Sequence, residues 1–199
     1  MADRTTPGAV RRPLRADAAR NVQALIAAAK ELFDEQGLDV ALDEVARRAG
    51  VGNATLYRNF PTRADLIVAV YADEVAELCL HGAMLMATAP ADEALFAWLD
   101  IFVVHVATKR ALALAGTEHS SERRTELFDT WHEVMRKVAG DLYERAREAD
   151  AVSPDVSVEE LLALTYAAAI AGTGPEHARR LLRMMRYGFA GPSTASPTT

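Results

Sequence analysis

Cysteine and long apolar runs are both scarce in this sequence of 199 residues. Cys79 is the one cysteine, so neither an internal disulfide nor a metal site built from several cysteines can form. The longest nearly apolar run, residues 161–172, is well short of the roughly 20 residues that a membrane-spanning helix needs. The basic, proline-containing start lacks the apolar segment of a signal peptide. We therefore expect a cytoplasmic protein with no membrane partner.

Aromatic residues are few as well, at 7% of the chain, although half of all residues are apolar. Strands are rich in aromatic and β-branched residues, whereas the abundant Ala and Leu favour helices. The apolar spacing predicts about nine helices, at residues 17–36, 42–49, 53–59, 62–86, 92–108, 110–115, 122–149, 157–171 and 175–189. The expected fold class is therefore all-α, with disordered segments at 1–15 and 191–199.

Basic charge is concentrated at one end of the chain. The net charge is −6, but residues 1–70 carry ten Lys/Arg against nine Asp/Glu, and the remainder carries twelve against nineteen. The first 20 residues alone contain five arginines and two aspartates. A basic arm on an otherwise acidic chain favours an anionic partner at the N-terminal end.

Two short helices joined by Gly50-Val51-Gly52 form the most specific pattern, at residues 42–60. The pattern is typical of a helix-turn-helix, whose second helix reads the DNA major groove. Leu56 and Phe60 are expected to anchor that helix, leaving its polar residues outward. Asn53 suits adenine, Thr55 a thymine methyl or a phosphate, and arginines suit phosphates. The candidate DNA-contacting residues are Asn53, Ala54, Thr55, Tyr57, Arg58, Asn59, Thr62, Arg63, Arg47 and Arg48.

The segment ALDEVARRAGVGNATLYRNFPTRADLIVAVYADEVAEL resembles the DNA-binding domain of the TetR family of bacterial transcription regulators. The resemblance implies that Thr55, Tyr57 and Asn59 contact the operator. Two residues depart from the family pattern. Asn59 stands where His is most common, and Ala41 replaces the usual Ser or Thr, which removes one side-chain cap and one phosphate contact.

The resemblance also implies a C-terminal helical domain that binds an effector and dimerises. We expect a helix-turn-helix domain at 16–62 and the ligand-binding and dimerisation domain at 63–190. The candidate pocket residues are Met84, Trp98, Phe102, His105, Phe128, Trp131, Met135 and Tyr166. An apolar pocket of this kind suits a small hydrophobic or aromatic effector. For each apolar member the alternative is an ordinary core position, and for His105 a hydrogen-bonded core histidine.

The last two helices carry more apolar surface than a single chain needs for its own core. They are expected to form the homodimer interface through Leu161, Leu164, Thr165, Ala168, Leu181, Leu182, Met185 and Phe189. The alternative is a fully buried helix within one chain. Dimerisation is favoured because one short recognition helix needs a second copy to bind a palindromic operator.

Enzymatic motifs are missing from the sequence. A di-iron bundle needs paired Glu-x-x-His motifs, and the nearest match is the single Asp129-x-x-His132. The sequence also lacks a His-Glu-x-x-His motif, a phosphate-binding glycine loop and a Gly-x-Ser-x-Gly turn. We expect no catalytic residues, metal or cofactor. The expected function is a transcriptional repressor released from double-stranded DNA by its effector; the alternatives are an activator and a helical interaction module or enzyme without DNA binding.

Overall fold

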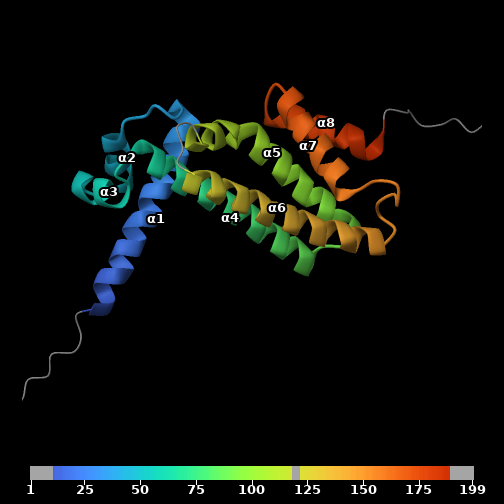
Figure 1. Cartoon of the computed structure of the whole chain (residues 1–199), viewed down its shortest axis with the longest axis horizontal. Helices are drawn as coiled ribbons and strands as arrows, with labels where there is room; N and C mark the ends of the chain where they lie inside the picture. Colours follow the sequence, from blue (N-terminus) through green and yellow to red (C-terminus); the bar gives the residue numbers. More distant parts are fainter. Residues whose placement is uncertain (1–10, 118–121, 189–199) are drawn as a thin grey trace, which may run out of the picture. The chain divides into compact units, whose positions relative to one another are not determined.

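The computed structural model describes residues 11–117 and 122–188, which contain eight α-helices and no strand (Figure 1). The predicted all-α class is confirmed. The helices are α1 (Arg11–Gln36), α2 (Leu42–Ala49), α3 (Asn53–Asn59), α4 (Arg63–Thr88), α5 (Ala91–Thr117), α6 (Glu122–Glu148), α7 (Val158–Ala171) and α8 (Pro175–Tyr187). The chain divides into two compact units, Met1–Asp73 and Glu74–Thr199.

The two largest differences from the predicted helices concern α5 and the start of α1. The helices expected at 92–108 and 110–115 form the single helix α5, because Lys109 between them favours helix and forms an ion pair with Glu74 inside the second unit. Helix α1 begins at Arg11 rather than Asp17, so residues 11–15 of the expected arm are helical. Pro13 is tolerated there because the N–H groups of a first helical turn have no intrahelical acceptor. The rest of the expected disordered segments lies outside the described residues.

The first unit packs α1, α2, α3 and the start of α4 around one apolar core. Its fully buried members include Leu25 and Leu32 of α1, Val45 of α2, Leu56 of α3 and Leu66 of α4. An ion pair of 3.0 Å between Lys30 and Asp73 adds a polar link from α1 to α4. The recognition of any partner by α3 therefore depends on a scaffold of three other helices.

The second unit is organised around α5, which packs on α6, α7 and α8 (Figure 1). The indole of Trp98 on α5 is fully buried, and its Nε1 donates to the backbone oxygen of Leu78 on α4 at 3.1 Å. Helix α4 approaches α5 and α6 closely at Gly82, where a Cβ atom would stand 2.3 Å from Cγ1 of Val138. None of the described helices has an apolar stretch that could cross a bilayer.

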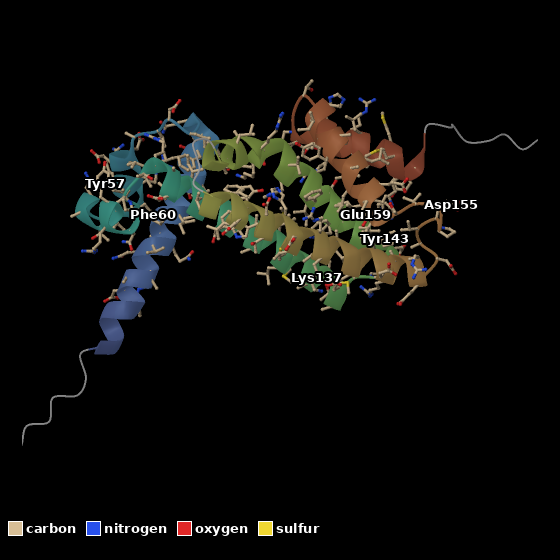
Figure 2. The ribbon with its side chains drawn as sticks, in the orientation of Figure 1. Tyr57, Phe60, Lys137, Tyr143, Asp155 and Glu159 are labelled. Carbon is tan, nitrogen blue, oxygen red and sulfur yellow. The ribbon has the colours of Figure 1, made fainter. Side chains whose placement is uncertain are left out.

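A side-chain capping motif fixes the start of α7. Ser157 and Glu160 form a reciprocal capping box at the start of α7, which satisfies two backbone N–H groups. The hydrogen bond from the backbone N–H of Ser157 lowers the pKa of the Glu160 carboxyl group. In the loop before α7, the hydroxyl of Tyr143 donates to the oxygen of Val156 at 2.7 Å (Figure 2). The end of α6 and the start of α7 are therefore joined by one buried phenol.

Candidate functional site

The turn between α2 and α3 has a defined backbone geometry. Gly50 adopts the left-handed conformation, with φ of 67° and ψ of 25°. The N–H of Val51 donates to the oxygen of Ala46 at 2.9 Å, and the N–H of Gly50 donates to that of Arg47 at 3.2 Å. This pair of bonds is the Schellman motif, which satisfies the last carbonyls of α2 and reverses the chain. The angle at which α3 leaves α2 is thereby set by backbone hydrogen bonds.

Helix α3 has one apolar side and one exposed polar side. Leu56 is 0% exposed and Phe60 is buried, whereas Tyr57 is 46% exposed (Figure 2). Asn53, Ala54, Arg58 and Asn59 are exposed, and Thr55 is half-buried. The predicted orientation of this helix is therefore found in the structure. DNA contact by its outward residues stays a prediction.

The polar groups on the outer side of α3 bond to one another and to α2. The hydroxyl of Tyr57 donates to Oδ1 of Asp43 at 3.3 Å. Arg58 donates to Oγ1 of Thr55 at 3.2 Å, and the amide of Asn59 donates to the backbone oxygen of Thr55 at 2.7 Å. These are exposed hydrogen bonds, so little free energy is lost when a partner replaces them.

The three candidate arginines outside α3, namely Arg47, Arg48 and Arg63, have different surroundings. Arg47 has a largely exposed side chain, 3.4 Å from Glu44. Arg48 is paired with Glu35 at 3.1 Å and Glu31 at 3.3 Å, and the hydrogen bond and charge of Glu35 raise its pKa. Arg48 therefore links α2 to α1, and a phosphate would have to compete with two carboxylates.

The polar groups of Arg63 and Thr62, at the start of α4, also bond to other groups of the chain. The guanidinium of Arg63 is half-buried and donates to the backbone oxygens of Leu38, at 2.6 Å, and Val40. The N–H and hydroxyl of Thr62 both donate to Oδ2 of Asp65, at 3.0 and 2.7 Å. Thr62 and Asp65 thus form a capping box, so the Thr62 groups that were candidates for DNA contact already bond to a carboxylate. At α2, Ala41 provides no side-chain cap, as its identity predicts.

A groove of about 360 Å³ lies in the second unit between α5, α6 and α7. It is lined by Trp98, Phe102, His132, Met135, Arg136, Leu162, Ala163 and Tyr166. Four of these were predicted as pocket residues, namely Trp98, Phe102, Met135 and Tyr166. His132 and Arg136 were missed, although they lie three and one residues from Met135. Both could have been found from helical spacing, because residues three or four positions apart, such as His132 and Arg136, lie on the same side of a helix.

Three other predicted pocket residues do not line this groove. Met84 is 53% exposed on α4. Phe128 is buried and packs edge-on against Trp131, with ring centroids 5.0 Å apart. Phe128 and Trp131 lie one to two helical turns before Met135 on the same side of α6. Apolar spacing alone therefore did not separate core positions from groove positions.

His105, the remaining predicted pocket residue, is 8% exposed and lines a separate cavity of about 150 Å³. That cavity also contains Lys109, which lies 3.4 Å from Glu74. Burial, together with the charges of Lys109 and His132, lowers the pKa of His105 to about 4. The imidazole is therefore neutral near pH 7. None of the described residues forms a group of three or more ligands suited to a metal ion.

The predicted dimer helices do expose an apolar surface, with partly different members. Leu164, Tyr166 and Ile170 on α7 are large, apolar and exposed. Thr165, Ala168 and Leu182 are instead buried inside the unit, because they occupy the side of α7 and α8 that faces the rest of the fold. Leu161, Leu181 and Met185 are half-buried, and Phe189 lies outside the described residues.

Comparisons with known proteins match both units. A family model described as "Bacterial regulatory proteins, tetR family" matches residues 25–70. A second, described as "Transcriptional regulator SbtR-like, C-terminal domain", matches residues 90–190. HTH-type transcriptional regulators of Staphylococcus aureus are 39% identical over 54 residues, which is 27% of this chain and 29% of their length. The chain thus spans less than a third of these curated relatives.

Solved structures match over nearly the whole chain. A TetR transcription regulatory protein from Mycobacterium vanbaalenii is 34% identical, with a TM-score of 0.71 over 90% of this chain and 100% of that one. A TetR transcriptional regulator from Streptomyces coelicolor is 32% identical, with a TM-score of 0.71 over 86% and 99%. FadR from Bacillus subtilis, solved in complex with stearoyl-CoA, shares the fold at 14% identity, with a TM-score of 0.58 over 84% and 99%.

The helix-turn-helix of the first unit and the helical second unit thus match the two parts of one kind of DNA-binding regulator. Transcriptional regulators of this kind are generally not enzymes. On the combined evidence of family models, relatives and geometry, the chain belongs to the TetR family of bacterial transcriptional regulators.

Proposed function

We propose that this regulator is a homodimeric repressor, released from a palindromic operator by a small apolar or aromatic ligand. The observation that carries the DNA-reading part is the two-sided character of α3. Leu56 and Phe60 anchor it in the core, while Tyr57 and Arg58 extend outward. Such a helix can enter a major groove without disturbing its own packing. The operator lies in the cytoplasm, where we expect the protein to act.

Among the candidate contacts, we assign base reading to the start of α3. Asn53 at its first turn can bond bidentately to adenine, and Thr55 can contact a thymine methyl. Tyr57, Arg58 and Arg47 suit phosphates because their polar tips are exposed. Arg48 and Arg63 are already bonded to protein acceptors, so their contribution is mainly to the scaffold.

A dimer is expected because α3 has only seven residues and covers one half-site. Leu164 and Ile170 on α7 supply an exposed apolar surface for the partner subunit. Light scattering should therefore give twice the mass of one chain. Replacement Leu164→Glu should produce monomers that bind the operator at least tenfold more weakly, whereas Leu127→Glu on α6, also exposed, should leave the dimer intact.

Ligand release requires the ligand to prefer the conformation that does not bind DNA. Trp98 of α5 connects the groove to α4, because it lines the groove and donates a hydrogen bond to Leu78 of α4. Helix α4 is continuous from Arg63 to Thr88 and so contributes to both units. A ligand that moves Trp98 can thereby shift α4, with a coupling free energy of about 1–3 kcal/mol.

The test begins with selection of bound fragments from a random DNA library, followed by fluorescence-anisotropy titration of the selected site at two salt concentrations. Tyr57→Ala should weaken binding about tenfold or more, which corresponds to about 1.4 kcal/mol. Tyr187→Ala is the matched control, because Tyr187 is also exposed but lies in the second unit. Failure to select any consensus, or equal effects of both variants, would contradict DNA reading by α3.

The repressor mechanism has its own test. A ligand that weakens operator binding by a given factor must bind to the DNA complex more weakly by that same factor. Calorimetry of the free protein and of the operator complex measures both factors. A ligand that strengthens operator binding would contradict release by the ligand and would instead indicate that the ligand acts as a corepressor.

A further inference from the structure

The groove between α5, α6 and α7 combines an apolar lining with a basic edge. Trp98, Phe102 and Met135 belong to its apolar part. His132 and Arg136 also line it, one helical turn apart on α6. No Asp or Glu lines this groove among the described residues. The arrangement provides cationic and hydrogen-bond-donating groups for a ligand, and no carboxylate neutralises them within the groove.

The surroundings of Arg136 differ from those of Arg145 and Arg179 in the same unit. Arg145 donates to the oxygen of Ala89, and Arg179 is paired with Asp100 and Glu176. Arg136 makes no hydrogen bond or ion pair with any residue in the described part of the chain. A guanidinium is charged at every physiological pH and binds a carboxylate in bidentate fashion. Its position at an apolar groove therefore favours an anionic ligand group.

The aromatic side chains indicate the shape of the ligand body. The rings of Trp98 and Phe102 are stacked, with centroids 5.2 Å apart and planes within 8°. The indole N–H of Trp98 is already bonded to Leu78, so it is not available as a donor to a ligand. Tyr166 adds an exposed ring from α7. Aromatic rings favour stacked or edge-on aromatic partners beyond the effect of buried area.

The volume of the groove sets an approximate size. At about 360 Å³ it lies near the lower end of the range of roughly 300–1,000 Å³ for small-molecule pockets. We propose that the groove binds a compact aromatic anion, a planar ring system whose single carboxylate pairs with Arg136. This inference rests on the proposed function, because it names the chemical class of the effector for the same groove.

The larger groove between α5 and α8 does not have the same chemistry. Its volume is about 490 Å³, and Glu93 and Asp100 line it together with Arg183 and Arg186. Arg186 also lies over the ring of Phe96, with its guanidinium carbon 4.1 Å from the ring centroid. Its charges are mixed and partly engaged within the protein, so the anion is assigned to the groove that contains Arg136.

The test is calorimetric titration of the full chain, without DNA, with three ligands. They are 2-naphthoate, its neutral amide 2-naphthamide, and the aliphatic anion decanoate. We expect naphthoate to bind at least about tenfold more tightly than either of the others, a difference of about 1.4 kcal/mol. Equal binding of acid and amide would overturn the assignment of Arg136, and tighter binding of decanoate would overturn the aromatic class. Binding of none of the three overturns the inference as a whole.

Two variants on α6 locate the anion. Arg136→Gln should reduce the preference for naphthoate over its amide to about twofold or less. Lys137→Gln removes the same charge from the neighbouring residue, which is exposed, paired with Asp141 at 2.8 Å and absent from the groove lining (Figure 2). It should keep the full preference. An equal loss in both variants would mean that general charge, rather than a contact in the groove, attracts the anion.

The same ligands separate this inference from the proposed function. If naphthoate binds with the expected preferences but leaves operator affinity unchanged, the ligand class is right and the release mechanism is wrong. If operator binding responds to another ligand while naphthoate does not bind, the release mechanism stands and the ligand class is wrong.

Discussion

Gly50 and Gly52 allow the turn between α2 and α3 to be tested by two substitutions that differ mainly in backbone conformation. Gly50 has a φ of 67°, in the left-handed region, whereas Gly52 has a φ of −67° and a ψ of 143°. A Cβ atom at either position would meet no other atom within 4 Å. Gly50→Ala and Gly52→Ala therefore report backbone strain without a steric clash.

The expected difference in stability follows from three effects. Alanine at Gly50 costs about 1–2 kcal/mol because of its left-handed conformation. Both substitutions restrict the unfolded chain and so stabilise by about 0.4–1 kcal/mol, an effect that cancels between them. At Gly52, the N-cap of α3, alanine loses roughly half a kcal/mol. Gly50→Ala should therefore be less stable than Gly52→Ala by about 1 kcal/mol.

Thermal unfolding followed by circular dichroism measures this difference. A change of about 1 kcal/mol corresponds to about 4–8 °C in Tm for a unit of this size. The two tryptophans, Trp98 and Trp131, both lie in the second unit, so their fluorescence provides an internal control. A Gly50→Ala protein as stable as Gly52→Ala would refute the role assigned to the left-handed turn.

Three further predictions concern the packing, the buried histidine and the DNA-reading surface. Gly82→Ala should destabilise the second unit in urea, because overpacking against Val138 costs about 1–3 kcal/mol, whereas the higher helix propensity of alanine stabilises by at most about 1 kcal/mol. An unchanged midpoint of urea unfolding would show that α4 and α6 can move apart at no cost. Because the pKa of His105 is about 4 instead of 6.5, the unfolded chain binds more protons between these values. The free energy of unfolding should fall by up to about 3 kcal/mol from pH 6.5 to 4, at 1.36 kcal/mol per pKa unit, and His105→Gln should flatten that dependence. Asp43→Asn removes a negative charge beside the Tyr57 hydroxyl and should tighten operator binding by about 0.5 kcal/mol at low salt, an effect that 1 M salt should abolish.

The orientation of α3 could be predicted because it depends on local spacing. Leu56 and Phe60 are four residues apart, which places them on one side of any helix, and Gly50 marks a left-handed turn. Capping boxes at Thr62 and Ser157 are local as well. Each of these features needs only the identity of residues within a few positions in the sequence.

Features that depend on distant residues could not be predicted in the same way. Arg63 looked available for a phosphate, but its acceptors are backbone oxygens about 25 residues earlier in the chain. Arg48 is similarly bonded to α1 through Glu35. In the second unit, apolar spacing grouped Trp98, Met135 and His105 but could not indicate that His105 lines a different cavity from the other two.

The hydrogen bond from Trp98 to Leu78 has a consequence for engineering this protein as a biosensor. The same indole lines the groove proposed to bind the ligand and bonds to α4, so a substitution at Trp98 should change the response together with the affinity. Phe102 and Tyr166 line the groove, and within the described part of the chain neither makes a hydrogen bond to α4, so they are the positions at which ligand preference can be altered separately. A library built at these two positions, with Trp98 kept constant, should yield sensors with new ligands and an unchanged output range.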